Sequence, residues 1–411
     1  MERPTFRPRS TLDAPRPPRG RFLCGFFNSP EVVFGPGALS YLDELPGRRA
    51  LIVTDPTLHA LGFTERVAGH LRTAGLEVDH FAEVEPEPSL ATVYRGAEAI
   101  RAFEPDWIVG LGGGSAMDAA KAMWVLYERP DLQVDEISPM VALGLGARAR
   151  LITIPTTAGT GAEVTWALVL TDTAEGRKLG LGSRETMATL AVVDPELTTR
   201  LPARITADTG LDVLVHAVEG YTGSWHNDFS DGLCLKAAQM VFDYLPRAVA
   251  DGADAEAREK MANAAAIAGL GFGNAMAALA HAMGHALGAV FHQPHGRCVG
   301  LYLPYTIEFV VAGGESRYAD IAHALRLPAD DEATGAATLV EAIRGLMRQI
   351  DEPTTVAGMG VSPDDHEAAI ERLCDLAEGD TQIVISVRIP ARDELAALFR
   401  YAYDGRKPEW L

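Results

Sequence analysis

The sequence is poor in cysteine and in positive charge. Its 411 residues include only 4 cysteines, widely and irregularly spaced, with no Cys-x-x-Cys pair. Such usage argues against a disulfide framework and favours a reducing compartment. Lysine and arginine number 36 against 56 acidic residues, which gives a formal net charge of -20. Nucleic acids and anionic membranes need a basic face, so neither is expected as a partner, and the sequence predicts a cytoplasmic protein.

Long hydrophobic runs are also lacking. The longest apolar stretch, 275–291, is interrupted by His281 and His285 and predicts a core helix rather than a membrane span. Residues 1–26 are rich in arginine and proline and lack the apolar centre of a signal peptide, so we expect a flexible leader. Hydrophobic residues still make up 47% of the chain, which is enough for a large core, and the length favours two domains.

Short β-branched runs alternate with helical stretches in the first half of the chain. Residues 50–54, 107–111, 151–155 and 190–194 predict buried strands. Unbroken apolar strands separated by helices indicate a parallel sheet that is covered on both faces. The sequence therefore predicts an α/β dinucleotide-binding domain over residues 27–200.

Strand signals nearly vanish after Pro195, and helices rich in Ala and Leu follow. Pro202, Pro304 and the Gly313–Gly314 pair are expected in the loops between these helices. The β-like run 381–390 is the exception in this half and has no predicted role. We predict an all-helical, metal-binding domain over residues 201–411, with the boundary near 195–205.

A glycine-rich turn follows the strand expected at 107–111. Gly112, Gly113, Gly114 and Ser115 would open a helix whose free backbone N–H groups face a diphosphate. Glycine is required there because a Cβ would hold the phosphate away. The spacing differs from Gly-x-Gly-x-x-Gly, and a tight turn without a ligand is the alternative interpretation.

Two further features belong to the same expected nucleotide site. The loop 155–165 offers the hydroxyls of Thr156, Thr157 and Thr160 at the carboxyl end of a strand, where open α/β sheets bind ligands. Asp55 follows the first predicted strand. Its carboxylate would accept hydrogen bonds from an adenosine ribose and repel a 2′-phosphate, which favours NAD over NADP. The Asp55-Pro56 pair is equally compatible with an ordinary helix start.

Five side chains in the second half are capable of metal binding. Asp212 and His216 are four residues apart, a spacing that places both on one face of a helix. His281 and His285 repeat this spacing, and His295 follows in an expected loop. Burying these groups without partners would cost several kcal/mol, whereas one divalent cation, Fe²⁺ or Zn²⁺, would satisfy them together. The spacing alone does not decide which four of the five bind.

Taken in order, these segments resemble the iron-containing (group III) alcohol dehydrogenase family over roughly residues 27–405. The matching segments are 112–115 with Asp118 and Lys121, then 155–165, 210–221, 281–285 and 294–296. The resemblance implies the fold that this family shares with dehydroquinate synthase. It also implies NAD(P) dependence, a cytoplasmic location and at least a dimer.

The resemblance also assigns residues to roles. It implies metal binding by Asp212, His216, His281 and His295, and a proton-relay role for the nearby His285. It implies cofactor contacts from Asp55, Gly113, Gly114, Ser115, Asp118, Thr157, Thr160 and Lys178. The expected reaction is hydride transfer between a small primary alcohol or diol and the nicotinamide, which interconverts the alcohol with an aldehyde or ketone.

The chain departs from the family pattern at several positions. Glu87 stands where the family often has Asn, and Ser386-Val387-Arg388 replaces a common Asn-Pro-Arg. His292 is not usual at its place and is a candidate for the substrate pocket. Trp166, Phe272 and Phe291 are candidates for its apolar walls.

Three alternative functions remain open at this point. One is a zinc-dependent polyol dehydrogenase of the glycerol type, and another is a non-catalytic sensor of metal or nucleotide. The third is a lyase of the dehydroquinate synthase type, whose phosphorylated substrate needs several basic residues near the metal. Around the segments that carry the predicted metal ligands only Arg297 is basic, so the lyase ranks below the alcohol dehydrogenase.

Overall fold

The computed structural model describes residues 26–175, 177–314 and 316–407. Nearly all of the expected leader, together with Cys24, therefore lies outside the described residues. The strands are β1 (Glu31–Phe34), β2 (Arg49–Val53), β3 (Glu77–Phe81), β4 (Trp107–Gly112), β5 (Arg150–Pro155), β6 (Ala167–Asp172), β7 (Arg177–Gly182) and β8 (Leu190–Val193).

The helices are α1 (Pro56–Ala60), α2 (Phe63–Thr73), α3 (Leu90–Phe103), α4 (Gly114–Glu128), α5 (Ala203–Thr222), α6 (Asp228–Ala250), α7 (Ala255–Phe272), α8 (Leu279–Phe291), α9 (His295–Ala312), α10 (Tyr318–Ala324), α11 (Glu332–Gln349), α12 (Pro363–Glu378) and α13 (Arg392–Asp404). Short 3₁₀ helices are η1 (Ala38–Glu44), η2 (Val134–Glu136), η3 (Ala162–Val164), η4 (Arg184–Thr186), η5 (Pro195–Thr198), η6 (Ala357–Met359) and η7 (Ile383–Ile385).

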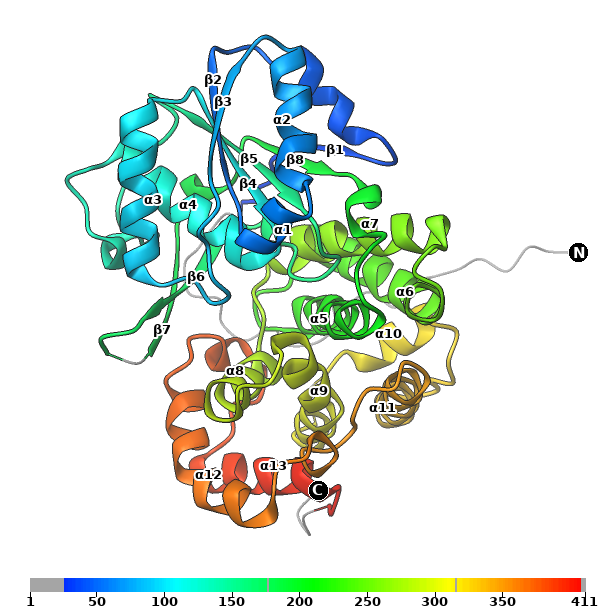
Figure 1. The fold of residues 1–411 in the computed structure, drawn as a ribbon. Helices are drawn as coiled ribbons and strands as arrows, with labels where there is room; N and C mark the ends of the chain where they lie inside the picture. The colour runs from blue at the N-terminus through cyan, green and yellow to red at the C-terminus, as the bar shows by residue number, and fades with distance from the viewer. Residues whose placement is uncertain (1–25, 176, 315, 408–411) are drawn as a thin grey trace, which may run out of the picture.

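A six-stranded parallel sheet organises the N-terminal half (Figure 1). Its strand order is β1-β8-β5-β4-β2-β3, and every neighbouring pair runs parallel. The four predicted strands are confirmed as β2, β4, β5 and β8. The two edge strands, β1 and β3, were not predicted, because edge strands carry polar residues and lack an unbroken apolar run.

Successive residues of the central strands pack on opposite faces of the sheet. Leu51 and Ile108 belong to a buried cluster with residues of α3 and α4. Ile52 and Val109 join residues of η1 and α2 on the other face. Helices lie on both sides of the sheet in Figure 1, as the unbroken apolar strands predicted.

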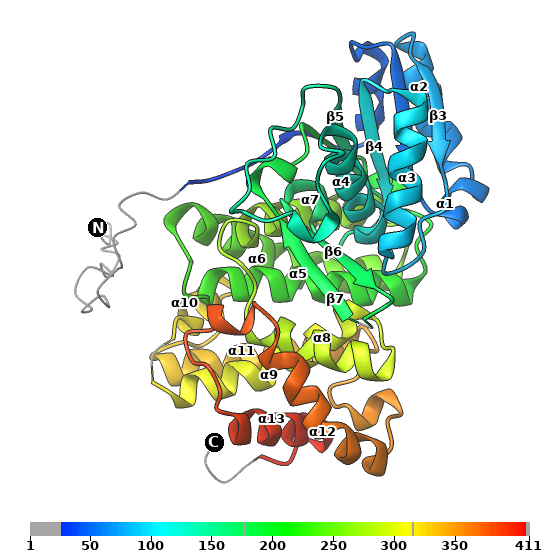
Figure 2. The same cartoon turned by 90° about the vertical axis from the view of Figure 1, so that its left-hand side faces the viewer.

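The antiparallel hairpin β6–β7 is a further element that the sequence did not reveal. It extends from the sheet toward the helical half (Figures 1 and 2). Leu168 and Leu170 are buried in the same cluster as residues of α4, while the intervening Val169 is exposed. The hairpin escaped prediction because glycine and charged residues interrupt the apolar pattern of β7.

Among the described residues, all regular structure after β8 is helical. Helix α5 lies at the centre, contacts α6, α7 and α9, and is buried along most of its length. The helices α10 to α13 lie on the side away from the sheet (Figures 1 and 2). None of the described helices is both long and apolar enough to cross a membrane.

Three details of this half correct the sequence predictions. Pro304 lies inside α9 and not in a loop. Burial of α9 on several sides outweighs the helical hydrogen bond that a proline removes. The helix expected at 275–291 begins only at Leu279, after a residue with positive φ, Met276 at 69°. The run 381–390 contains the 3₁₀ turn η7 rather than a strand, because no neighbouring strand pairs with it.

Candidate metal and dinucleotide site

Two loops are predicted to bind the nucleotide, the glycine turn 112–115 and the threonine loop 155–165. They meet at one edge of the sheet. Gly112 at the end of β4 is in register with Pro155 at the end of β5. The chain runs from β2 outward to β3 and returns to β4 on the other side of β2. Such a switch point leaves a crevice outside the carboxyl ends of the strands, which is where open α/β sheets bind ligands. Asp55 lies at this edge and caps α1, where its side chain accepts a hydrogen bond from Leu58 N at 2.9 Å.

The glycine turn lies against the threonine loop. Helix α4 begins at Gly114, so the helix start predicted at the glycine turn is confirmed. A Cβ at Gly113 would lie 3.6 Å from Thr157 Oγ1, and one at Gly114 would lie 3.0 Å from Thr160 Cγ2. The fold therefore brings together two loops that the sequence suggested separately, and a side chain on Gly114 would crowd the space between them.

Other predicted cofactor contacts have partners within the protein. Thr156 is buried, and its N–H donates to Gly112 O at 3.0 Å. Asp118 accepts a hydrogen bond from Val169 N at 2.9 Å and lies 3.6 Å from Lys121 Nζ. Lys121 Nζ also donates to Ala167 O at 2.8 Å, so Asp118 and Lys121 join α4 to β6.

Two cofactor predictions concern the rim of this edge. Lys178 Nζ on β7 forms an ion pair of 2.6 Å with Glu87 Oε1, the residue that departs from the family pattern. The N–H of Glu87 in turn donates to Ser115 Oγ at 3.3 Å. Ser115 and Lys178 are thus linked through Glu87. The contacts of all these residues with a cofactor stay predictions.

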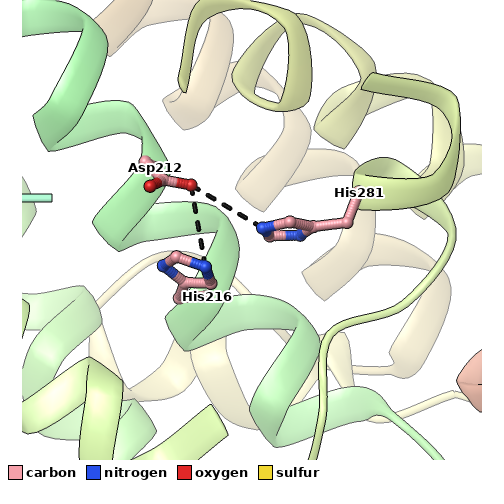
Figure 3. Close-up of side chains that lie close together, drawn as sticks. All are labelled: Asp212, His216 and His281. Atoms are coloured by element: carbon pink, nitrogen blue, oxygen red, sulfur yellow. Dashed lines mark ion pairs between the residues drawn. The ribbon is translucent and has the colours of Figure 1, made fainter. Parts of the chain in front are cut away.

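The predicted metal cluster is assembled from different helices (Figure 3). Asp212 and His216 face the same way on α5, and His281 approaches from the start of α8. Asp212 Oδ1 lies 3.7 Å from His216 Nε2 and 3.6 Å from His281 Nε2. One ligand atom from each of these residues lies within 4.8 Å of the others, and all three residues are buried. This spacing is suited to one shared cation.

His295, the fourth predicted ligand, lies close to the carboxylate of Asp212. Its Nε2 lies 3.3 Å from Asp212 Oδ1, and its side chain is 39% exposed. His295 was expected in a loop, but it is the first residue of α9. His285 is close to His295, with ring centroids 5.0 Å apart, yet its Nδ1 is bonded to Asp380 Oδ2 at 2.7 Å. The arrangement favours the predicted role of His295 as the fourth ligand and leaves His285 beside it, held by Asp380.

The sequence interpretation missed Glu219. Its carboxylate lies 2.6 Å from His281 Nδ1 and also accepts from the N–H groups of Ala278 and Ala280. It therefore fixes His281 with Nδ1 protonated and Nε2 facing Asp212. Glu219 is seven residues after Asp212, so the helical period that linked Asp212 to His216 could have revealed it.

The charges of the cluster suit a cation. Burial alone raises the pKa of Asp212, but the imidazoles of His216 and His295 outweigh it and hold this pKa well below the usual value. Burial lowers the pKa of His216 to about 3. Burial also opposes the charge of His281, but Glu219 and Asp212 outweigh it and raise the pKa to about 9. Metal binding would therefore displace a proton from His281.

Two buried atoms without hydrogen-bond partners also indicate a bound cation. Asp212 Oδ1 and His281 Nε2 are buried and make no hydrogen bond among the described residues. Buried polar atoms are rarely left without partners, because desolvation is costly. A carboxylate oxygen and imidazole nitrogens are ordinary ligands of Fe²⁺ and Zn²⁺. The residues present thus fit one divalent metal.

The threonine loop also contacts α5, the helix that carries Asp212 and His216. A Cβ at Gly159 would meet Thr209 on α5 at 2.7 Å. Beyond the loop, Trp166 Nε1 donates to Gly273 O at 2.8 Å, next to Phe272. The ring of Phe272 stacks on His216 with centroids 3.8 Å apart. The same segment therefore contacts both the glycine turn and the helix that carries two metal ligands.

The other proposed pocket residues are placed differently. Phe291 lines a cavity of 560 Å³ between α8 and the start of α12, whose lining includes none of the four predicted ligands. His292 ends α8 in the left-handed conformation. Arg297 is buried and paired with Asp208 and Glu352, so its charge is not free for a substrate. Of the three aromatic candidates, Phe272 has a direct contact with a predicted ligand.

Comparisons with known proteins find the same family in both halves of the chain. A family model described as "Iron-containing alcohol dehydrogenase" matches residues 29–195, and one described as "Fe-containing alcohol dehydrogenase family, C-terminal" matches residues 206–403. The chain is 37% identical over 382 residues to an NADPH-dependent butanol dehydrogenase of Clostridium saccharobutylicum, covering 92% of this chain and 98% of that protein.

It is also 33% identical over 395 residues to an NAD-dependent methanol dehydrogenase of Bacillus methanolicus, covering 92% of this chain and all of that protein. Among solved structures, a 1,3-propanediol oxidoreductase superposes with a TM-score of 0.86 at 31% identity, covering 92% of this chain and 100% of that one. The chain spans 46% of the length of a matching aldehyde-alcohol dehydrogenase from Streptococcus pneumoniae.

Proposed function

The chain belongs to the iron-containing alcohol dehydrogenase family, and on that premise we propose that it interconverts a short primary alcohol or diol with its aldehyde, using NAD. The general activity, NAD(P)-dependent oxidation of an alcohol or reduction of an aldehyde, follows from membership of the family. The choice of NAD, the substrate size, the metal and the roles of single residues are the proposal.

One observation carries the proposal. A buried carboxylate and imidazoles from three helices converge, with unpartnered atoms on Asp212 and His281, beside the segment that also contacts the glycine turn. Asp212, His216, His281 and His295 would hold the metal, Fe²⁺ in the first instance and Zn²⁺ as the alternative. When bound, such a metal supplies a Lewis acid that polarises a carbonyl oxygen or favours an alkoxide.

The chain's own residues orient and shield this site. Glu219 keeps His281 Nε2 turned toward Asp212. Phe272 covers one face of His216 and excludes water there. His285 is 21% exposed and held by Asp380, so it can carry a proton between the reacting oxygen and solvent. The dinucleotide would lie over the glycine turn and place its nicotinamide toward the helices, since hydride transfer requires the two carbons to be close.

The preference for NAD rests on Asp55. Its carboxylate stands at the end of β2, at the same edge as Gly112, and an NADP phosphate placed there would face a negative charge. One relative is named for NADPH and another for NAD, so the comparisons favour neither.

The substrate proposal follows the relatives. Those proteins are named for butanol, methanol and 1,3-propanediol. Because Arg297 is paired internally, the ligand segments offer no free cation for a phosphorylated substrate, which disfavours the lyase alternative.

The remaining proposals concern organisation. We retain domain limits of 27–200 and 201–411 and a cytoplasmic location. We also propose a homo-oligomer, since the edge strand β1 leaves backbone groups unpaired and Phe34 is 66% exposed. Light scattering would measure the size of this assembly.

A direct assay tests the proposed function. The purified protein is stripped with a chelator, loaded with Fe²⁺ or Zn²⁺, and assayed with methanol, butanol, 1,3-propanediol and glycerol and with the matching aldehydes. We expect turnover of the short primary alcohols with NAD, and a shift toward NADP in Asp55→Ser. Activity confined to glycerol with zinc would support the polyol alternative instead. Failure to turn over any alcohol or aldehyde with either nucleotide would reject the proposal.

A further inference from the structure

His295 is held differently from the other two histidines of α8 and α9. Glu219 bonds His281 Nδ1 at 2.6 Å, and Asp380 bonds His285 Nδ1 at 2.7 Å. Within the described residues, no hydrogen bond to His295 Nδ1 is found, and the side chain is 39% exposed. The imidazole contacts Asp212 and the ring of His285, but no carboxylate fixes its Nδ1, so its place depends more strongly on the backbone that carries it, at the first turn of α9.

The first turn of α9 packs directly against the backbone of α5. A Cβ on Gly296 would lie 2.0 Å from the carbonyl oxygen of Asp208, a distance that no side chain could occupy. Asp208 is four residues before Asp212, which is one helical turn along the same face of α5. The backbone contact at Gly296 is therefore adjacent to the 3.3 Å contact between His295 and Asp212.

Arg297 stabilises this contact between α9 and α5 through two ion pairs. Its guanidinium is 7% exposed, with Nη2 2.8 Å from Asp208 Oδ1 and Nε 2.8 Å from Glu352 Oε2. Glu352 follows α11, so one cation joins α5, α9 and the end of α11. The rigid fork of an arginine fixes the directions of two carboxylates together, which a lysine cannot do. Buried ion groups of this kind hold one geometry firmly, because breaking one contact leaves a charge without a partner.

We propose that the clamp formed by Asp208, Arg297 and Glu352 is a positioning device that places His295 against Asp212 and thereby sets metal affinity. Among the described residues, no hydrogen bond or ion pair joins the clamp to a predicted metal ligand, so it acts through the backbone of α9. The inference rests on the proposed metal site and deepens it by assigning a role to residues outside the ligand set.

The main variant neutralises the whole clamp, so that no unpaired charge stays buried. It combines Arg297→Met with Asp208→Asn and Glu352→Gln. The single change Arg297→Lys, which keeps the charge but loses the fork, is a milder second variant. The matched control is Arg344→Met with Glu308→Gln, since this pair ties the far part of the same helix α9 to α11.

Metal binding by the apo-protein is the readout. Each protein is titrated with Co²⁺ or Zn²⁺ against a chelating dye, and the visible spectrum of the Co²⁺ form reports the ligand set. Circular dichroism checks that each variant is folded. We expect the neutralised clamp to lose about 10- to 100-fold in affinity, as removal of outer partners usually does, with a smaller loss in Arg297→Lys and none in the control.

A comparison with His295→Ala shows whether the clamp acts through that residue. Combined with His295→Ala, the neutralised clamp should cause no further loss of affinity. Additive losses, or a folded clamp variant with unchanged affinity and an unchanged Co²⁺ spectrum, would overturn the inference. Absence of metal binding by the unaltered protein would instead reject the proposed function, so the two failures are distinguishable.

Discussion

At the scale of single residues, buried carboxylates do the orienting. Glu219 and Asp380 each hold the Nδ1 atom of a histidine, which leaves the opposite nitrogen available. Glu163, in contrast, is buried and forms no ion pair with any described residue, although the charge of Lys121 acts on it. Two predictions follow from these different surroundings.

Glu163 should make stability depend on pH. Burial raises its pKa from 4.5 to about 7, against the smaller opposing effect of Lys121. Between these values the unfolded chain has lost the proton while the folded protein keeps it, so wild-type stability should fall as the pH rises from about 4.5 to 7. Glu163→Gln should flatten this fall and stabilise the protein above pH 7 by up to about 3 kcal/mol. Urea unfolding at pH 5 and pH 8 measures it, and equal effects at both pH values would contradict the explanation.

Asp380 should matter for turnover more than for binding. In Asp380→Asn the charge beside His285 is lost and the amide can turn its NH₂ toward Nδ1, which would give the ring the wrong tautomer. We expect kcat to fall by about 10- to 100-fold, with KM for the alcohol changed little.

Steady-state kinetics of the metal-loaded enzyme check this prediction, with the exposed Asp375→Asn on α12 as control. A change in KM alone would show that Asp380 serves substrate binding rather than proton transfer.

At the scale of elements, the loop 155–165 connects the predicted nucleotide site with the helix that carries Asp212 and His216. It faces the glycine turn through Thr157 and Thr160, and it contacts α5 at Gly159. Its Gly161 has φ +61°, and a Cβ there would lie 2.6 Å from the Cα of Gly269 on α7. Loop and helix can approach so closely only because both positions are glycine.

Gly161→Ala should therefore disturb the fold and the cofactor site together. Left-handed strain and the clash with α7 should cost about 2–4 kcal/mol of stability and weaken NAD binding. The control is Gly180→Ala on β7, where a Cβ meets nothing within 4 Å and φ is not positive. Denaturant unfolding and fluorescence titration with NADH measure the two effects. Similar results for both variants would show that the close approach at Gly161 has no special importance.

At the scale of the whole molecule, the metal site joins helices that are distant in the chain. Its predicted ligands come from α5, α8 and α9, and the clamp at Arg297 adds the end of α11. A metal that binds the folded state and not the unfolded one stabilises the entire helical half by mass action.

Removal of the metal should lower the melting temperature. At a free metal concentration near 1,000 times Kd, the bound ion contributes about 4 kcal/mol. A chelator should lower Tm, and Zn²⁺ or Fe²⁺ should restore it. Asp212→Asn should lack this response, because it removes the charge that three imidazoles share. Calorimetry with and without chelator checks the prediction, and an equal metal response in the variant would contradict the assigned ligands.

The sequence by itself determined the features that depend on local spacing. The four central strands follow from unbroken apolar runs, the turn that opens α4 follows from its glycines, and the pairing of Asp212 with His216 follows from the helical period of 3.6 residues. Edge strands and the β6–β7 hairpin escaped, because their apolar patterns are short and interrupted. Family resemblance, and not spacing, selected His295 over His285 as a ligand.

Only the tertiary structure decided which distant residues contact each helix face. His281 and His285 have the same spacing as Asp212 and His216, yet Glu219 turns one toward the cluster and Asp380 holds the other beside it. These partners lie 62 and 95 residues away in the sequence. A helical period fixes which side chains share a face, whereas contacts between distant segments arise only when the helices pack. For that reason the clamp that joins Arg297 to Asp208 and Glu352 could not be read from the chain alone.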